Sequence, residues 1–299
     1  MPEFLWQIGI TTTFVLLTRA STWRRFSKLL PRREGRPKMK EESQDRNFET
    51  ELGRFWDSPK LGASLRAKVK GGIPALNEKP YDPQVAAEEI YRLVFAELHI
   101  DHMDDDISAQ LNALAAVGGF AVQMALREIL IVHGGKREQD VFAVASTEDG
   151  GRFFLGDLTN EGLYGNATGQ VSFYSLIAAG AEAAGAEKLP DIEDISRHIV
   201  QTMGTDQFGV PRVKLSRFIQ AYPSVLLDRF WNPVRNILVT FTPSPAHWPL
   251  VIGLAVQKLI TRNAKIAEPE KLATFAIEVA SAMAKIDPNK IYRAHFASR

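Results

Sequence analysis

Apolar residues recur at helical spacing along most of the chain after residue 80. Asp82 and Pro83 suit the N-cap and the first position of a helix. An apolar face then follows at three- and four-residue spacing: Ala86, Ile90, Leu93, Val94 and Leu98. Similar patterns predict further helices over about 107–132, 192–203, 248–261 and 269–286, the last ended by Pro288.

Glycines interrupt several of these predicted helices. Within a helix, a glycine costs about 1 kcal/mol relative to alanine, so a compensating contact is expected. Gly118, Gly119, Gly180 and Gly253 therefore predict close helix crossings.

One segment has a β pattern instead. Two runs rich in valine and phenylalanine, 141–146 and 152–155, flank Asp149-Gly150, a dipeptide that suits the tight turn of a hairpin. We expect the run 157–170 after the hairpin to be a loop, and the prolines Pro223 and Pro233 to interrupt the helical pattern around them. The fold class predicted is mainly α: a domain of about seven helices with one β-hairpin over residues 81–299.

The balanced net charge of +1 hides a segregation along the chain. Residues 1–40 carry nine Lys/Arg and two acids, a net +7, and the rest of the chain carries a net −6. The sequence therefore divides into a basic arm at 1–40, a polar linker at 41–80 and the helical domain.

The arm contains an uncharged apolar run at 4–17, which includes Trp6 and Phe14. As a helix it would span roughly 21 Å, short of the roughly 30 Å hydrocarbon core. It would therefore lie in the membrane interface or cross a thinned bilayer. If it crosses, the basic residues after it keep the domain cytoplasmic.

A second stretch of the arm has the pattern of an interfacial helix on anionic lipid. Trp23, Phe26, Leu29 and Leu30 recur at helical spacing, and Arg24, Arg25 and Lys28 lie between them. Two alternatives remain open: the aromatic residues dock on the domain, or the segment is a mitochondrial-type targeting sequence.

A polar run at 99–106 contains candidate metal ligands. His99, Asp101, His102 and Asp104 are the right types for zinc, manganese or iron. The alternative is a solvated turn in which Asp105 or Asp106 caps the next helix.

The 157–170 segment carries the second candidate site. Asp157, Asn160, Glu161, Tyr164 and Asn166 stand among glycines, as in loops that bind polar ligands. In the alternative, the aspartate and asparagine bond local backbone in Asx-turns.

Other chemistry is excluded or weakly indicated. The absence of cysteine rules out disulfides, thiolate nucleophiles and Cys-ligated metals. No Walker A motif and no G-x-S-x-G motif occurs, so no cofactor can be named from the sequence. The net charge of +1 gives no overall positive field, so no nucleic-acid partner is expected. His198 is expected at the surface. Phe230 and Trp231 favour the core, with Arg235 paired to an acid, although this segment would also suit a protein interface.

Two classes of function fit these features. The first is a non-enzymatic binding or scaffolding module, cytoplasmic and held at an anionic membrane surface by its N-terminus, with a possible protein partner. The second is a metal-dependent or other hydrolase-type enzyme that uses the 99–106 and 157–170 segments. Convergence of His99 and Asp157 on one concave pocket would favour the enzyme.

Overall fold

The structure is a computed structural model, and it describes residues 82–100, 107–147, 150–165, 171–215, 221–242 and 244–291. The elements follow one another in this order: α4 (Pro83–Ile100), α5 (Ile107–Leu126), a π-helical turn (Arg127–Val132), a 3-10 turn (Glu138–Asp140), β1 (Ala143–Ser146), β2 (Arg152–Leu155), α6 (Asp157–Tyr164), α7 (Phe173–Ala183), α8 (Ile192–Thr202), α9 (Pro223–Phe241), a second 3-10 turn (Pro245–His247), α10 (Trp248–Arg262) and α11 (Pro269–Met283). The expected fold class, a mainly α domain with one hairpin, is confirmed.

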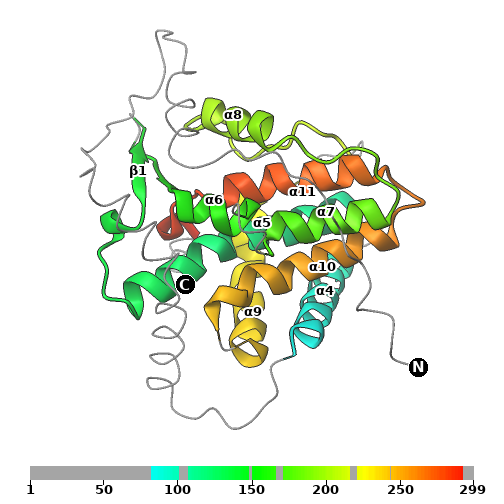
Figure 1. Cartoon of the computed structure of the whole chain (residues 1–299), viewed down its shortest axis with the longest axis horizontal. Helices are drawn as coiled ribbons and strands as arrows, with labels where there is room; N and C mark the ends of the chain where they lie inside the picture. Colours follow the sequence, from blue (N-terminus) through cyan, green and yellow to red (C-terminus); the bar gives the residue numbers. More distant parts are fainter. Residues whose placement is uncertain are drawn as a thin grey trace.

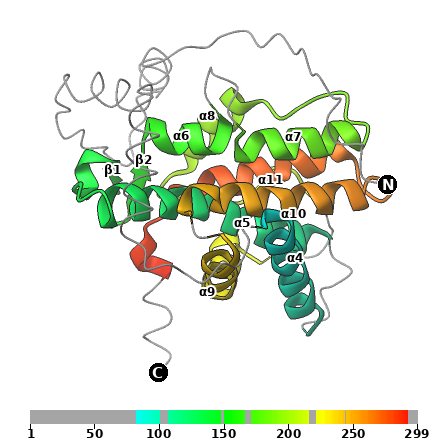
Figure 2. The same ribbon diagram turned by 60° about the horizontal axis from the view of Figure 1, so that its bottom comes forward.

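Helix α5 is the centre of the domain. It packs on α9, α10 and α11, and every residue from Ser108 to Leu126 is buried. Figure 2 shows α4 and α9 on one side of it and α6, α7 and α8 on the other side. Helix α6 packs directly on α5, and α8 packs on α11. A helix that is apolar all round requires such enclosure.

Among the described residues, one helix, Ile107–Val132, is long and apolar enough to cross a membrane. The bent pair Pro223–Phe241 and Pro245–Arg262 meets the same criterion only when its halves are counted together. In Ile107–Val132, 72% of the apolar window is buried inside the domain, so this helix serves as the core.

The glycine crossings are confirmed. A Cβ on Gly119 would collide with the backbone carbonyl of Ala280 in α11. A Cβ on Gly180 would lie 2.9 Å from Cγ of Gln257, and one on Gly253 would lie 2.8 Å from Cδ1 of Leu176. Small residues thus let α5 approach α11, and α7 approach α10, as Figure 1 shows.

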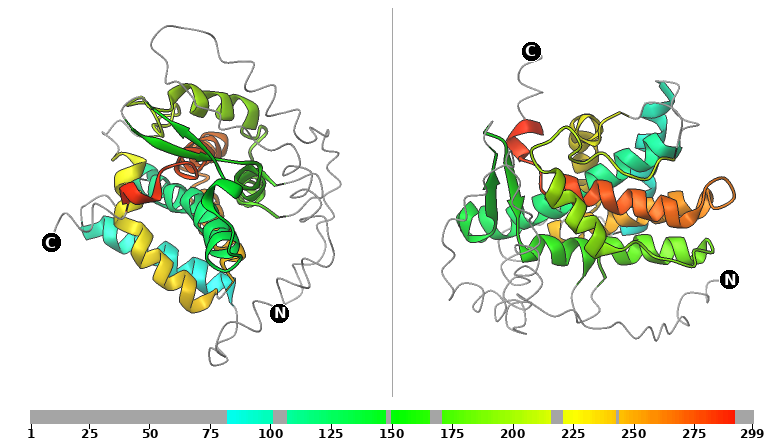
Figure 3. Two further views of the ribbon diagram at one scale, coloured as in Figure 1. Left: turned by 90° about the vertical axis from the view of Figure 1, so that its left-hand side faces the viewer. Right: turned by 90° about the horizontal axis from the view of Figure 1, so that it is seen from above.

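The hairpin is also confirmed. Strands β1 and β2 pair antiparallel, with Val144 opposite Phe154, and Gly150 has the positive φ (81°) that the turn requires. The backbone N–H of Phe154 donates to the carbonyl of Lys285 at 2.9 Å, which fastens the ribbon to the end of α11. Figure 3 shows the ribbon at one end of the helices. This support is expected, since an isolated two-stranded ribbon is marginal in water.

The helix predicted over 107–132 is confirmed as one continuous helix, α-helical to Leu126 and π-helical from Arg127 to Val132. The expectation that Pro223 and Pro233 interrupt the helical pattern is wrong. Pro233 does not interrupt α9, and Pro223 begins it at a position where the missing N–H has no helical partner to lose. Packing supplies the reason, because Phe230, Trp231 and Val234 around Pro233 are completely buried and hold the helix together.

Candidate functional site

A row of polar side chains runs along the otherwise apolar helix α11. Thr274, Glu278, Ser281 and Lys285 are spaced by four, three and four residues, so they share one face. Glu278 is 2% exposed, Ser281 is completely buried, and Lys285, in the turn after the helix, is 8% exposed. The apolar stripe that predicts this helix in the sequence does not reveal the row.

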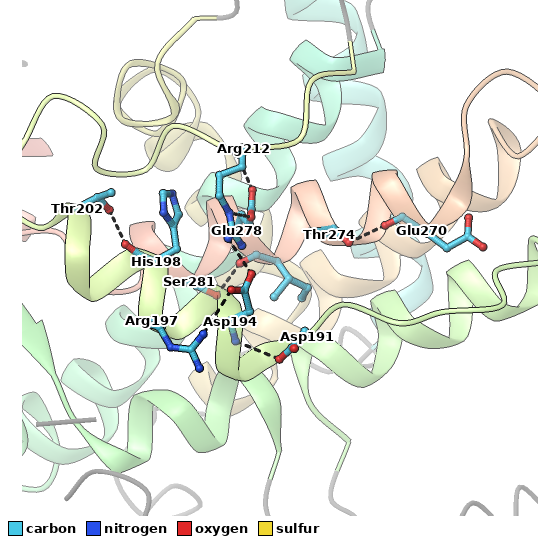
Figure 4. Close-up of polar contacts among 11 residues, drawn as sticks. Asp191, Asp194, Arg197, His198, Thr202, Arg212, Glu270, Thr274, Glu278 and Ser281 are labelled. Atoms are coloured by element: carbon cyan, nitrogen blue, oxygen red, sulfur yellow. Dashed lines mark hydrogen bonds and ion pairs between the residues drawn. The ribbon is translucent and has the colours of Figure 1, made fainter. Parts of the chain in front are cut away.

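Glu278 is held by Arg212, which comes from the segment after α8. The backbone N–H of Arg212 donates to Oε2 of Glu278 at 2.8 Å, and its Nε donates to Oε1 at 2.6 Å. Its Nη1 lies 2.7 Å from Oδ2 of Asp194 in the first turn of α8. Figure 4 shows this arginine between the two carboxylates. Burial alone would lower the pKa of Arg212, but the hydrogen bonds and charges of Glu278 and Asp194 outweigh it and raise that pKa.

His198 lies half-buried beside this arginine, so the expectation of a surface histidine is wrong. Burial and the charge of Arg212 lower its pKa below 6.5. The charges of Glu278 and Asp194, and a hydrogen bond to the backbone of Val210, only partly offset that shift. The imidazole is therefore mainly neutral at pH 7. The segment after α8, which includes Val210 and Arg212, covers His198. The helical periodicity of α8 could not predict this contact, because the covering residues lie outside the helix.

The other half of the row joins α6 to α11. The Tyr164 hydroxyl donates to Oγ of Ser281 at 2.7 Å, and Ser281 donates to the carbonyl of Ile277 at 2.5 Å. Burial raises the pKa of Tyr164, and its hydrogen bonds with Ser281 and, less strongly, with Ser196 of α8 oppose the shift. The amine of Lys285 donates to the carbonyl of Ser281 at 2.9 Å, and burial lowers its pKa to about 8.

The row and the side chains beside it, His198 and Tyr164, thus bring together a carboxylate, an imidazole, three hydroxyls and an amine, which are the groups of acid–base chemistry. However, Glu278 accepts twice from Arg212, and Tyr164 and Ser281 bond to each other. These contacts connect α6, α8 and the segment around Arg212 to α11. The contacts Arg212–Glu278, Arg212–Asp194 and Tyr164–Ser281 are called the clasp below, because together they hold the layers of the domain on α11.

The candidate ligand-binding residues at 157–166 do not form the expected loop. Asp157, Asn160, Glu161 and Tyr164 belong to helix α6, and Asn166 lies outside the described residues. Leu158 and Leu163 bury one face of α6, and an acid in its first turn suits the helix dipole, which explains the helix. Of the four side chains, Tyr164 reaches the polar row, whereas Asp157 and Glu161 are exposed.

The candidate metal ligands fall mostly outside the described residues. His99 is in the last turn of α4, whereas Asp101, His102 and Asp104 lie beyond the described part of the chain. Within that part, no group of three or more His, Asp or Glu side chains is placed to hold a metal ion. The membrane-contacting residues Trp6, Phe14, Trp23, Arg24, Arg25, Phe26 and Lys28 also lie outside it.

The aromatic segment of α9 is part of the core, as expected. Phe230 and Trp231 are completely buried, and Trp231 packs edge-to-face on Phe120 with ring centroids 4.9 Å apart. Nη2 of Arg235 lies 3.1 Å from Oε1 of Glu128. These residues stabilise the domain, and the two buried rings are not exposed to a partner.

No protein-family model matches this chain, and neither a curated protein nor a solved structure shows a significant match to it.

Proposed function

We propose that this protein is a non-enzymatic binding or scaffolding module, which residues 1–40 hold at the cytoplasmic side of an anionic membrane. The observation that carries the proposal is the charge segregation: residues 1–40 have a net charge of +7, and residues 81–299 a net charge of −6. Each Lys or Arg near an anionic surface contributes about 1 kcal/mol to binding, whereas the acidic domain is repelled. This favours attachment through the arm rather than through a face of the domain.

The arm offers two separable contributions to membrane binding. The charges of Arg24, Arg25 and Lys28 act over a Debye length of roughly 8 Å at physiological salt, so their contribution weakens as salt is added. Burial of the apolar run 4–17 and of the Trp23/Phe26 stripe is insensitive to such screening.

The clasp on α11 supports a binding role over a catalytic one. A general base must lie within hydrogen-bond reach of the substrate proton that it takes, and Glu278 is only 2% exposed. Both carboxylate oxygens of Glu278 already accept from Arg212, and Ser281 is completely buried beneath Tyr164. The polar groups that the fold brings together are thus engaged in holding the helices.

The test is flotation of the full-length protein with liposomes that contain phosphatidylserine. The substitutions Arg24→Gln, Arg25→Gln and Lys28→Gln together should strongly reduce the floating fraction at low salt. The matched control removes three positive charges from the domain instead, at Arg92, Lys271 and Lys290, which are exposed. It should float like the unaltered protein. Equal losses in both variants would mean that net charge, not the arm, governs binding, and would overturn the proposal.

A further inference from the structure

The segment 203–215, which follows α8, lies over α8 and α11 without forming a helix or a strand, and is called the strap below. Its turns are closed by hydrogen bonds within the segment. The backbone N–H of Phe208 donates to the carbonyl of Thr205 at 3.1 Å, and that of Val210 donates to the carbonyl of Gln207, also at 3.1 Å. Because these bonds are local, the strap can move without breaking the hydrogen bonds of the helices.

Two apolar contacts hold the strap on the domain. The ring of Phe208 packs edge-to-face on Phe153 of β2, with ring centroids 4.7 Å apart. Gly209 is buried, and a Cβ at this position would lie 2.8 Å from the methyl group of Met283 at the end of α11. Lifting the strap would therefore uncover apolar surface on β2 and α11.

Arg212 supplies charged contacts between the strap and the helices beneath it. It donates twice to Glu278 of α11, and its Nη1 lies 2.7 Å from Oδ2 of Asp194 of α8. Nη1 of Arg197 lies 3.6 Å from the other oxygen of Asp194. The side chains of Arg212 and Asp194 are 38% and 45% exposed, so water reaches this fastening from outside. A competing cation close to the two carboxylates could therefore displace the arginine.

His198 is placed to be that cation. It follows Asp194 by four residues on α8, so the two side chains are neighbours on one helix face, and the imidazole lies beside Arg212 (Figure 4). The charged groups that act on it among the described residues come from three elements: Arg212 of the strap, Glu278 of α11 and Asp194 of α8.

These influences on His198 act in opposite directions. Burial and the charge of Arg212 disfavour the imidazolium, whereas the carboxylates of Glu278 and Asp194 favour it. Lifting the strap would hydrate the imidazole and take Arg212 away, but both carboxylates would remain on the helices. The opened form therefore binds a proton at His198 more tightly than the seated form does.

We propose that His198 is a proton-operated release for the strap: the protonated imidazole pairs with Asp194 and Glu278 in place of Arg212, and residues 203–215 lift from α8 and α11 at mildly acidic pH. The proton comes from water, and Arg212 stays charged and becomes hydrated. Because the opened form takes up the proton first as the pH falls towards the ordinary histidine pKa of about 6.5, acidification favours opening. The proposal is independent of membrane attachment.

The test is hydrogen–deuterium exchange of the full-length protein at about pH 7.5 and about pH 5.5, corrected for the intrinsic exchange rate at each pH. The backbone N–H of Arg212, which bonds to Glu278, is the direct reporter of the seated strap. We expect its protection to decrease as the pH falls, by at most about tenfold per pH unit, the limit for one proton. Protection of the buried helix α5 should be retained, because the opening is local.

Variants separate the charge of His198 from its bulk. His198→Gln cannot take up the proton and should keep the strap protected at both pH values. His198→Lys, a permanent cation, should lower the protection already at about pH 7.5, whereas the uncharged His198→Met should not. The matched control is His133→Gln, which removes a 64% exposed histidine at the end of the π-helical turn and should respond to pH like the unaltered protein.

Three outcomes would overturn the proposal. One is strap protection that is the same at both pH values in the unaltered protein. Another is a decrease at about pH 5.5 that persists undiminished in His198→Gln, which would assign the effect to the carboxylates. The third is an equal loss of protection in α5, which would mean that the whole domain unfolds.

Discussion

Arg212 and Glu278 are joined by two hydrogen bonds, one from the arginine backbone N–H and one from its Nε, at 2.8 and 2.6 Å. The carboxylate is 2% exposed, whereas the arginine side chain is 38% exposed and reaches Asp194 as well. One residue thus pairs a buried charge on α11 and fixes its own chain segment and α8 over that helix.

Removal of the arginine should therefore destabilise the domain. Arg212→Met leaves the Glu278 carboxylate buried and unpaired, and should cost about 3 kcal/mol in the free energy of unfolding by urea. Arg212→Met combined with Glu278→Leu should recover most of that loss, since no charge then remains buried. Arg197→Met, which breaks only exposed ion pairs, should cost less than about 1 kcal/mol. Equal losses for Arg212→Met and Arg197→Met would contradict the clasp.

The crossing at Gly119 gives a second prediction. A Cβ at this position meets the backbone of Ala280, which cannot move as a side chain can. Gly119→Leu should overpack the crossing and lower the free energy of unfolding by at least about 1–3 kcal/mol. Ala96→Leu, on the exposed face of α4, should change it by less than about 0.5 kcal/mol. An unaltered melting temperature for Gly119→Leu would show that α5 and α11 are not in contact there.

Lys285 predicts a rise in stability at alkaline pH. Its pKa is about 8 in the folded protein and 10.5 in an unperturbed lysine. Between these values the unfolded chain binds the extra proton, so stability increases with pH, by about 3 kcal/mol over the whole window. Chemical denaturation at a series of pH values should show this increase. In Lys285→Met, the part of the increase that comes from titration of this amine should be absent. If stability changes with pH in the same way in the unaltered protein and in Lys285→Met across this window, the amine of Lys285 is not buried without compensation.

His198 predicts a loss of stability at mildly acidic pH. Burial and Arg212 hold its folded pKa below 6.5, so the unfolded chain takes up the proton first as the pH falls. The contribution is therefore present at neutral pH and decreases below about pH 6.5. His198→Gln should lose less stability than the unaltered protein between about pH 7.5 and pH 5.5 in urea unfolding. An identical pH dependence in the two proteins would show that this histidine is not enclosed.

Periodicity predicted the elements whose burial is local in sequence. The Asp82 cap, the glycine crossings and the hairpin turn at Gly150 each depend on neighbouring residues or on one helix face. The pairing of Arg212 with Glu278 joins positions 66 residues apart in the chain, and no local pattern encodes it. The cover over His198 comes from the segment after α8, beyond the helix whose periodicity places the histidine.

One signal of the polar row was present in the sequence. Thr274, Glu278, Ser281 and Lys285 repeat at helical spacing, which indicates a polar face. Whether such a face meets solvent or other helices depends on tertiary packing, so sequence could not reveal that it is buried. For the segment that contains α6, the glycines at 162, 165 and 169 favoured a loop, but burial of Leu158 and Leu163 outweighed them over α6.

The most direct test of the central claim compares the full-length protein with a chain that begins at Tyr81 in flotation with phosphatidylserine liposomes, at low and at high salt. We expect the full-length protein to float at low salt, and to float partly at high salt because the apolar run 4–17 is insensitive to screening. The shorter chain, with its net charge of −6, should stay in solution at both salt concentrations. If the full-length protein stays soluble and monomeric as well, or if the shorter chain floats equally, the arm is not a membrane anchor and the account is contradicted.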